Sequence, residues 1–127
     1  MQDQPHPEEI LTRVANFLKG PATRESGPHI SFQLRVAANA TEICQRQLTL
    51  SPQADDEELE SLRALLQTDG DLMALNRELA RRIREGALTL ESPGLADHLW
   101  STTLAKLAVD QPNYSGYRAA LAERGEA

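Results

Sequence analysis

The sequence predicts an all-α protein, and three observations support this fold class. Leu and Ala, with Glu, Arg and Gln, dominate the composition, and these residues are strong helix formers, whereas only 4% of the residues are aromatic. Apolar residues recur at spacings of three and four, which is typical of one buried face of a helix. Gly and Pro separate these stretches. We therefore expect an antiparallel bundle of about five helices with a short C-terminal helix.

The first helix is expected to begin at Pro7, because a proline at the first helical position loses no hydrogen bond. Its end is predicted at Lys19-Gly20-Pro21, followed by a surface loop over residues 20–28. The second helix is predicted from about His29 to Leu48. The expected buried stripe of the first helix consists of Ile10, Leu11, Val14, Phe17 and Leu18. That of the second helix consists of Val36, Ala37, Ala40, Ile43, Cys44 and Leu48.

Ser51-Pro52 is predicted to stop the second helix. A third helix is expected from Asp55, because the carboxylates of residues 55–58 would suit the positive end of a helix dipole better than a metal ion. Capping and stop signals predict the next two helices, from Asp71 to Gly86 and from Ser92-Pro93 to about Val109. A last short helix is expected from Tyr117 to Glu123. The expected core residues of the other three helices are Leu59, Leu62, Leu65, Leu66, Leu72, Leu75, Leu79, Ile83, Ala96, Leu99, Trp100, Thr103, Leu104 and Leu107.

The length of 127 residues predicts a single helical domain, with a loose tail over residues 1–6 and fraying over residues 116–127. No apolar run approaches the roughly 18 residues that a membrane span needs, and no signal peptide is recognisable. The single cysteine, Cys44, excludes an intrachain disulfide and favours a reducing compartment. We expect a cytoplasmic protein that does not bind membranes.

The formal net charge is −6, and residues 1–50 contribute five charges of each sign, so the acidic excess lies after residue 50. A nucleic-acid-binding protein would need a basic face. Four arginines cluster at residues 77–84, but Glu78 lies among them and Glu85 follows directly, which indicates a solvated helix face. We expect no nucleic-acid partner.

The patterns required for metal or nucleophilic chemistry are missing from the sequence. Neither His29 nor His98 has an acidic residue three positions earlier, as a carboxylate-bridged metal site in a bundle would require. Cys44 lies on the expected apolar stripe of the second helix, where a cysteine usually acts as a small apolar side chain. We therefore expect no metal ion and no cofactor.

Eight polar residues beside the core stripes are the candidate site. If their helices converge, cations, amides, a carboxylate and a phenol would line one cleft suited to an anionic ligand. These residues are Arg35, Asn39, Asn76, Arg82, Lys106, Asp110, Asn113 and Tyr114. Structural roles explain them equally well: Asn76 would fix helix register, Lys106 would pair with Asp110, and Asn113 with Tyr114 would cap the fifth helix.

Three segments resemble an uncharacterised bacterial family of small helical domains. They are residues 35–40 (RVAANA), residues 75–86 (LNRELARRIREG) and residues 104–115 (LAKLAVDQPNYS), and the resemblance covers roughly residues 4–115. Members of this family occur alone, or near or fused to aminoglycoside-phosphotransferase-like kinases, and beside acyl-CoA dehydrogenases. The loop with two Gly-Pro pairs at residues 20–28 departs from the family pattern.

The resemblance implies a non-enzymatic accessory or interaction domain that contacts a kinase-like or acyl-CoA dehydrogenase-related protein, or a second copy of itself. That hypothesis requires an exposed apolar patch. The alternative is a domain that binds, or acts on, an anionic or acyl ligand through the eight polar residues, with Asp110 as base and Lys106 or Tyr114 as acid.

Overall fold

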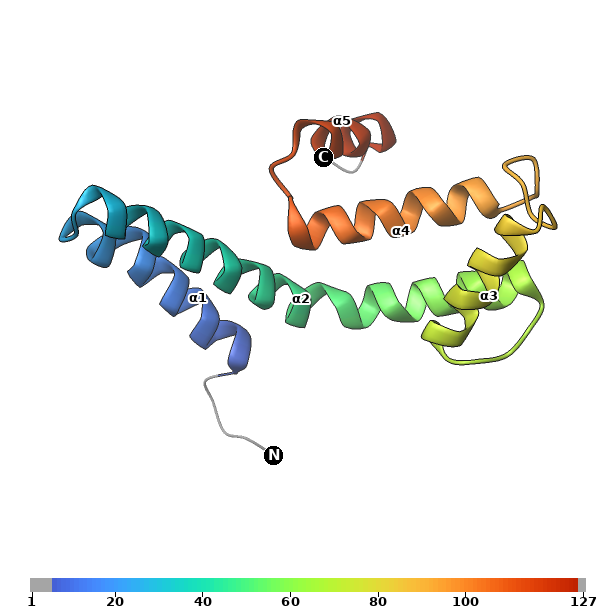
Figure 1. Cartoon of the computed structure of the whole chain (residues 1–127), viewed down its shortest axis with the longest axis horizontal. Helices are drawn as coiled ribbons and strands as arrows, with labels where there is room; N and C mark the ends of the chain where they lie inside the picture. Colours follow the sequence, from blue (N-terminus) through green and yellow to red (C-terminus); the bar gives the residue numbers. More distant parts are fainter. Residues whose placement is uncertain (1–5, 126–127) are drawn as a thin grey trace. The chain divides into compact units, whose positions relative to one another are not determined.

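The computed structural model describes residues 6–125, which form five α-helices and one π-helical segment (Figure 1). The predicted all-α class is confirmed, since no strand occurs between residues 6 and 125. Most of the expected N-terminal tail and the last two residues of the expected frayed end lie outside the described part of the chain. The helices are α1 (Pro7–Phe17), the π-helix η1 (Leu18–Ala22), α2 (Pro28–Leu66), α3 (Leu72–Arg84), α4 (Leu95–Asp110) and α5 (Ser115–Arg124).

The chain divides into two compact units at the Leu50–Ser51 peptide bond, inside α2. The N-terminal unit contains α1, η1 and the first half of α2. The C-terminal unit contains the second half of α2 together with α3, α4 and α5. The organisation of both units as a single domain stays a prediction.

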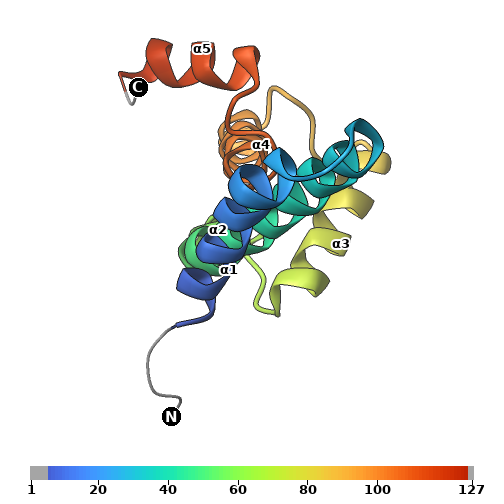
Figure 2. The same ribbon diagram turned by 90° about the vertical axis from the view of Figure 1, so that its left-hand side faces the viewer.

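In the N-terminal unit, α1 and the first half of α2 lie side by side (Figures 1 and 2). As predicted, α1 begins at Pro7, and the side chain of Glu9 accepts a hydrogen bond of 3.0 Å from the backbone N–H of His6. Two alanines, Ala15 of α1 and Ala38 of α2, are almost completely buried. Because alanines are small, the two helices can approach closely.

The predicted end of the first helix at Lys19-Gly20-Pro21 is wrong. The chain continues as the π-helix η1, which contains Pro21, and helical geometry persists to Arg24. A side-chain hydroxyl group adds a contact to this wider turn, since Thr23 Oγ1 donates to the carbonyl of Leu18 at 2.6 Å. The buried Ser31 Oγ donates to the carbonyls of Thr23 and Ser26, both at 3.1 Å, and thereby fixes the reversal into α2.

The predicted stop at Ser51-Pro52 is also wrong, because α2 runs unbroken through Pro52. Proline removes one backbone N–H, the usual donor to the carbonyl four residues earlier, yet its fixed φ is compatible with a helix. The carboxylates of residues 55–58 therefore lie inside α2 and do not form the first turn of a separate helix. Glu57 and Glu58 instead accept hydrogen bonds of 2.7 Å from the side-chain amides of Gln53 and Asn76.

Leucine side chains form the core of the C-terminal unit. Five are buried, and four partly buried leucines surround them: Leu62, Leu66, Leu75, Leu79 and Leu95, with Leu59, Leu65, Leu72 and Leu88. The predicted caps of α3 are confirmed, since Asp71 Oδ1 accepts a hydrogen bond of 2.7 Å from the N–H of Ala74, and Gly86 follows the helix with a φ of 74°. A glycine adopts this left-handed conformation without strain.

The starts of the last two helices differ from their predicted positions. α4 begins at Leu95 after Gly94, and Ser92 does not cap it: Ser92 Oγ instead accepts a hydrogen bond of 3.0 Å from the N–H of Thr89. α5 begins at Ser115, two residues before the predicted start.

Several apolar residues that were predicted to be buried are exposed. They are Ile10, Val14, Phe17, Val36, Ala37, Ala40, Leu48, Ile83, Ala96, Leu99, Trp100 and the free thiol Cys44, together with Thr103. In the N-terminal unit, the buried face of α2 carries Ser31 and Ala38, whereas Val36 and Leu48 lie on a different face. The periodicity identified residues that share a face, but it assigned the wrong face to the interior.

Candidate functional site

The N-terminal unit exposes many large apolar side chains, which we call the N-terminal apolar surface. Its eight large members are between 41% and 60% exposed: Ile10, Val14, Phe17, Ile30, Phe32, Val36, Leu48 and Leu50. Within residues 6–50 the buried apolar residues are only Ala15 and Ala38. The N-terminal unit therefore leaves most of its large apolar side chains in contact with water.

The N-terminal apolar surface has two parts, one on each helix. On α1, Ile10, Val14 and Phe17 stand at intervals of four and three residues, which places them on one face. The five members on α2 extend along its first half. Monomeric proteins rarely expose contiguous apolar patches larger than a few hundred Å², and larger ones mark contact sites.

The C-terminal unit contains a small polar pocket between the second half of α2 and α4, with a volume of about 60 Å³. His98 of α4 is 4% exposed, and its Nδ1 lies 2.9 Å from Ser61 Oγ of α2. The lining residues are Ala54, Glu57, Glu58, Ser61, His98, Ser101, Thr102 and Ala105. Because a hydroxyl both donates and accepts, Ser61 satisfies either neutral tautomer of the imidazole.

Burial lowers the pKa of the His98 imidazole below its usual 6.5, and the positive charge of Lys106 acts in the same direction, whereas the charge of Glu58 opposes it. The ring is therefore neutral at neutral pH. The hydrogen bond between Ser61 and His98 joins α2 to α4, and no third group converts the pair into a catalytic triad among the contacts of residues 6–125. We interpret the pocket as a structural contact.

We predict that the free energy of unfolding decreases as the pH falls below 6.5. The unfolded chain binds a proton on His98 near its usual pKa of 6.5, but the folded chain does so only at lower pH, so acid favours unfolding. Urea denaturation between about pH 8 and about pH 5 measures this dependence. The variant His98→Gln, which keeps hydrogen-bonding groups but does not titrate, should show a smaller decrease. Equal pH dependence in both proteins would contradict the assignment to His98.

Asn76 is one of the predicted ligand residues, and its side chain forms hydrogen bonds within the protein. Its Nδ2 donates to Glu58 Oε1 at 2.7 Å and to the carbonyl of Leu72 at 3.1 Å. The first bond joins α3 to α2, and the second closes one turn of α3. This arrangement corresponds to the structural alternative, in which Asn76 fixes the register of neighbouring helices.

Arg82 also has partners within the fold. Its Nη1 donates to the carbonyl of Leu66 at 3.0 Å, and its Nε donates to Glu78 Oε1 at 2.7 Å. Leu66 is the last residue of α2, where a carbonyl lacks a helical partner. Hydrogen bonds from Arg81 and Arg82 lower the pKa of the Glu78 carboxyl group to about 2. Arg82 therefore connects the end of α2 to α3.

The other six predicted ligand residues are exposed: Arg35, Asn39, Lys106, Asp110, Asn113 and Tyr114. Arg35 and Asn39 belong to the N-terminal unit, and the other four belong to α4 and the turn that follows it. Their convergence on one ligand stays a prediction. Lys106 and Asp110 form no ion pair with each other among the described contacts, although they stand four residues apart on α4.

The sequence pattern did not predict the hydrogen bond between Ser61 and His98. Leu95, His98, Thr102 and Ala105 stand at intervals of three and four on α4. This spacing places them on one helix face, so the histidine belonged to a buried stripe. No comparable pattern indicates which residue of another helix would face it.

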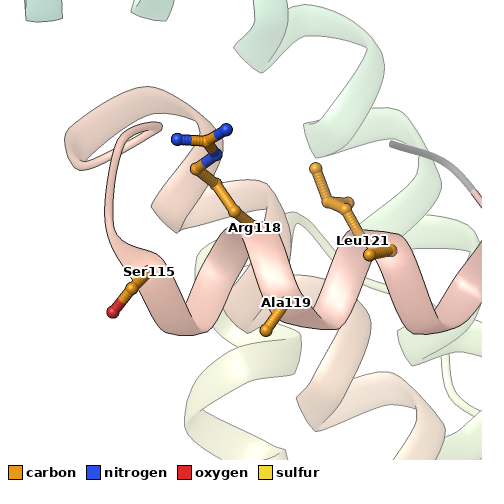
Figure 3. A pocket seen from close by; sticks show the side chains of 5 residues that line it. Ser115, Arg118, Ala119 and Leu121 are labelled. Atoms are coloured by element: carbon orange, nitrogen blue, oxygen red, sulfur yellow. The ribbon is translucent and has the colours of Figure 1, made fainter.

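The described part of the chain has a further hollow, which lies along a single helix. A hollow along α5 is lined by Ser115, Arg118, Ala119, Leu121 and Ala122, and Figure 3 shows Arg118 and Leu121 projecting to the same side of the helix. All lining residues belong to one helix, so no second element closes the hollow. Between residues 6 and 125, no three His, Cys, Asp or Glu side chains are grouped to hold a metal ion. In the same part of the chain, no helix has the length and apolar character required to cross a bilayer.

These features define an all-α protein with an exposed apolar surface on one unit and a leucine core in the other. Residues 24–114 match the model of a protein family described as "Domain of unknown function (DUF6285)". The match spans more than half of the 127 residues, and the chain belongs to this family. No curated protein and no solved structure matches the chain significantly. Membership in a family without an assigned function agrees with the resemblance described above, whereas the link to kinases and acyl-CoA dehydrogenases stays a prediction.

Proposed function

We propose that the chain is a non-enzymatic interaction module whose N-terminal apolar surface binds other protein chains. The observation that carries this proposal is the exposure of eight large apolar side chains on the N-terminal unit. At roughly half exposure each, they leave on the order of 800 Å² of apolar side chain in water. For all contacts of this surface together, this area is about what one partner contributes to a standard protein interface.

The structure of the N-terminal unit explains why such a surface would need a partner. Within residues 6–50 the large apolar side chains are at most partly buried, and only the small Ala15 and Ala38 are buried, so the hydrophobic stabilisation of this unit is small. A partner that covers the surface would supply the missing burial, and it would stabilise the folded unit in proportion to its affinity.

The resemblance of the sequence supplies a class of partner for the α1 part of the surface. On the basis of that resemblance, a kinase-like protein or an acyl-CoA dehydrogenase-related protein is the candidate partner. The acidic excess lies in residues 51–127, so a basic patch on the partner would accelerate the encounter without contacting the apolar surface.

We expect co-produced partner protein to be recovered with the tagged wild-type chain and lost with the double variant Val14→Glu/Phe17→Glu. Buried unpaired carboxylates at an apolar interface are unfavourable, so binding should weaken at least about a hundredfold. Affinity capture followed by native mass spectrometry measures the recovery.

The control is Leu90→Glu, which places the same charge on a 70% exposed apolar residue of the C-terminal unit. This variant should bind as the wild type does. Equal recovery with all three proteins, or no recovery with any of them, would count against the proposed docking of a partner on α1.

A further inference from the structure

We propose that two copies of the chain pair in antiparallel orientation through the first half of α2, about a two-fold axis close to Ala40. This inference rests on the proposed interaction role and names the second chain that covers the α2 part of the N-terminal apolar surface. The part on α1 remains available for another protein.

The first observation is a face of α2 that no other element among residues 6–50 covers. One face of α2 carries the buried Ser31 and Ala38, and Ser31 contacts the carbonyls of Thr23 and Ser26 in the preceding segment. A different, wide face carries Ile30, Phe32 and Val36, which are 53%, 60% and 54% exposed, and Leu48 and Leu50, which are 50% and 41% exposed. Between the large residues, this face carries the small side chains Ala37, Ala40 and Cys44, all exposed.

The second observation identifies the occupant. The positions of the apolar residues are symmetric about Ala40. In an antiparallel pair centred there, Ile30 lies on the same edge of the interface as Leu48 of the second copy, and Phe32 lies on the same edge as its Leu50, each about 3 Å apart along the helix axis. Val36 lies level with Cys44 of the second copy, and the two small Ala40 side chains meet at the axis and allow close approach. An interface with two-fold symmetry must be self-complementary in this way, whereas a site for a different protein has no need of such symmetry.

Charge favours the same occupant. Residues 1–50 carry five acidic and five basic side chains, so two N-terminal units do not repel each other through net charge. In the antiparallel register, Arg35 lies level with Gln45 of the second copy, and Glu42 lies level with its Ala38. No like charges are opposed at these positions.

The area is sufficient for a stable pair. Five large side chains at about half exposure contribute on the order of 500 Å² per chain. The pair would therefore bury on the order of 1,000 Å² before the alanines are counted, which is about the minimum for a specific interface.

The first test is the mass of the purified full-length chain, measured by native mass spectrometry and by light scattering. We expect the wild type at twice 14.0 kDa, and we expect Val36→Glu at 14.0 kDa. The matched control is Phe17→Glu, which changes a 59% exposed residue of α1 and should remain a dimer. A monomeric wild type, or a dimer that persists in Val36→Glu, would overturn the inference.

The second test reports the orientation of the helices by oxidative cross-linking. In the antiparallel register, the two Cys44 residues stand about 12 Å apart along the helix axis, too far for a disulfide, so the wild type should not cross-link. In a Cys44→Ser background, Ala40→Cys should cross-link readily and Thr49→Cys should not. Cross-linking of Thr49→Cys, or none with Ala40→Cys, would exclude this register.

The two proposals fail in different ways. A monomer that still captures its partner through α1 would refute the symmetric pair and leave the proposed function intact. A dimer whose Val14→Glu/Phe17→Glu variant captures partner as well as the wild type would support the pair and refute docking on α1.

Discussion

Replacing Leu62 with alanine is expected to lower the free energy of unfolding of the C-terminal unit by about 2–5 kcal/mol. Leu62 is fully buried and lies in a cluster with four other buried leucines. Truncation removes apolar contacts and leaves a cavity that neighbouring helices fill only in part. Urea unfolding followed by the fluorescence of Trp100, the only tryptophan, reports on this unit.

The matched control is Met73→Ala. Met73 lies on α3 of the same unit but is 64% exposed, so its truncation should change stability by no more than about 0.5 kcal/mol. If Leu62→Ala and Met73→Ala were equally stable, Leu62 would not occupy the core described above.

The second large effect is expected for Arg82→Ala, which should reduce the free energy of unfolding by about 1–3 kcal/mol. The substitution removes the donor to the Leu66 carbonyl at the end of α2 and one of the donors to Glu78. The side chain of Arg82 is 27% exposed, so solvent compensates for these losses only in part. Chemical denaturation monitored by circular dichroism measures the change.

Two further variants test the geometry of Arg82. Arg84→Ala removes an exposed cation from the same turn and should be nearly neutral. Arg82→Lys keeps the charge, but one ammonium group cannot reproduce the planar fork that contacts both Leu66 and Glu78, so it should recover only part of the stability. Full recovery with lysine would show that charge alone matters at this position.

Local signals predicted the fold class and several helix ends, because they depend on neighbouring residues. Pro7, Asp71 and Gly86 act within one turn, and each has its predicted role. Pro52 gave a misleading signal, because its fixed φ lies in the helical range and α2 continues although the proline removes one backbone hydrogen-bond donor. Because of the error at Pro52, the carboxylates of residues 55–58 were wrongly predicted to form the first turn of a separate helix.

The candidate site was less predictable because it depends on contacts between helices. Asn76 and Arg82 were correctly identified as polar residues beside core stripes, but their partners Glu58 and Leu66 belong to another helix. Likewise, periodicity grouped Val36 with Leu48, yet it gave no information on which face would meet α1. A sequence period defines faces, whereas tertiary contacts decide which face is covered.

The leucine core of the C-terminal unit has a consequence for how its topology is encoded. Nine side chains of one kind form this core and its margin, so shape alone distinguishes poorly between correct and shifted alignments of the helices. The directional bonds of Asn76, Arg82 and Ser61 with residues of other helices remove that ambiguity. The information that aligns these helices therefore resides in a few polar residues, and the leucines can exchange for other aliphatic residues of similar volume without loss of topology.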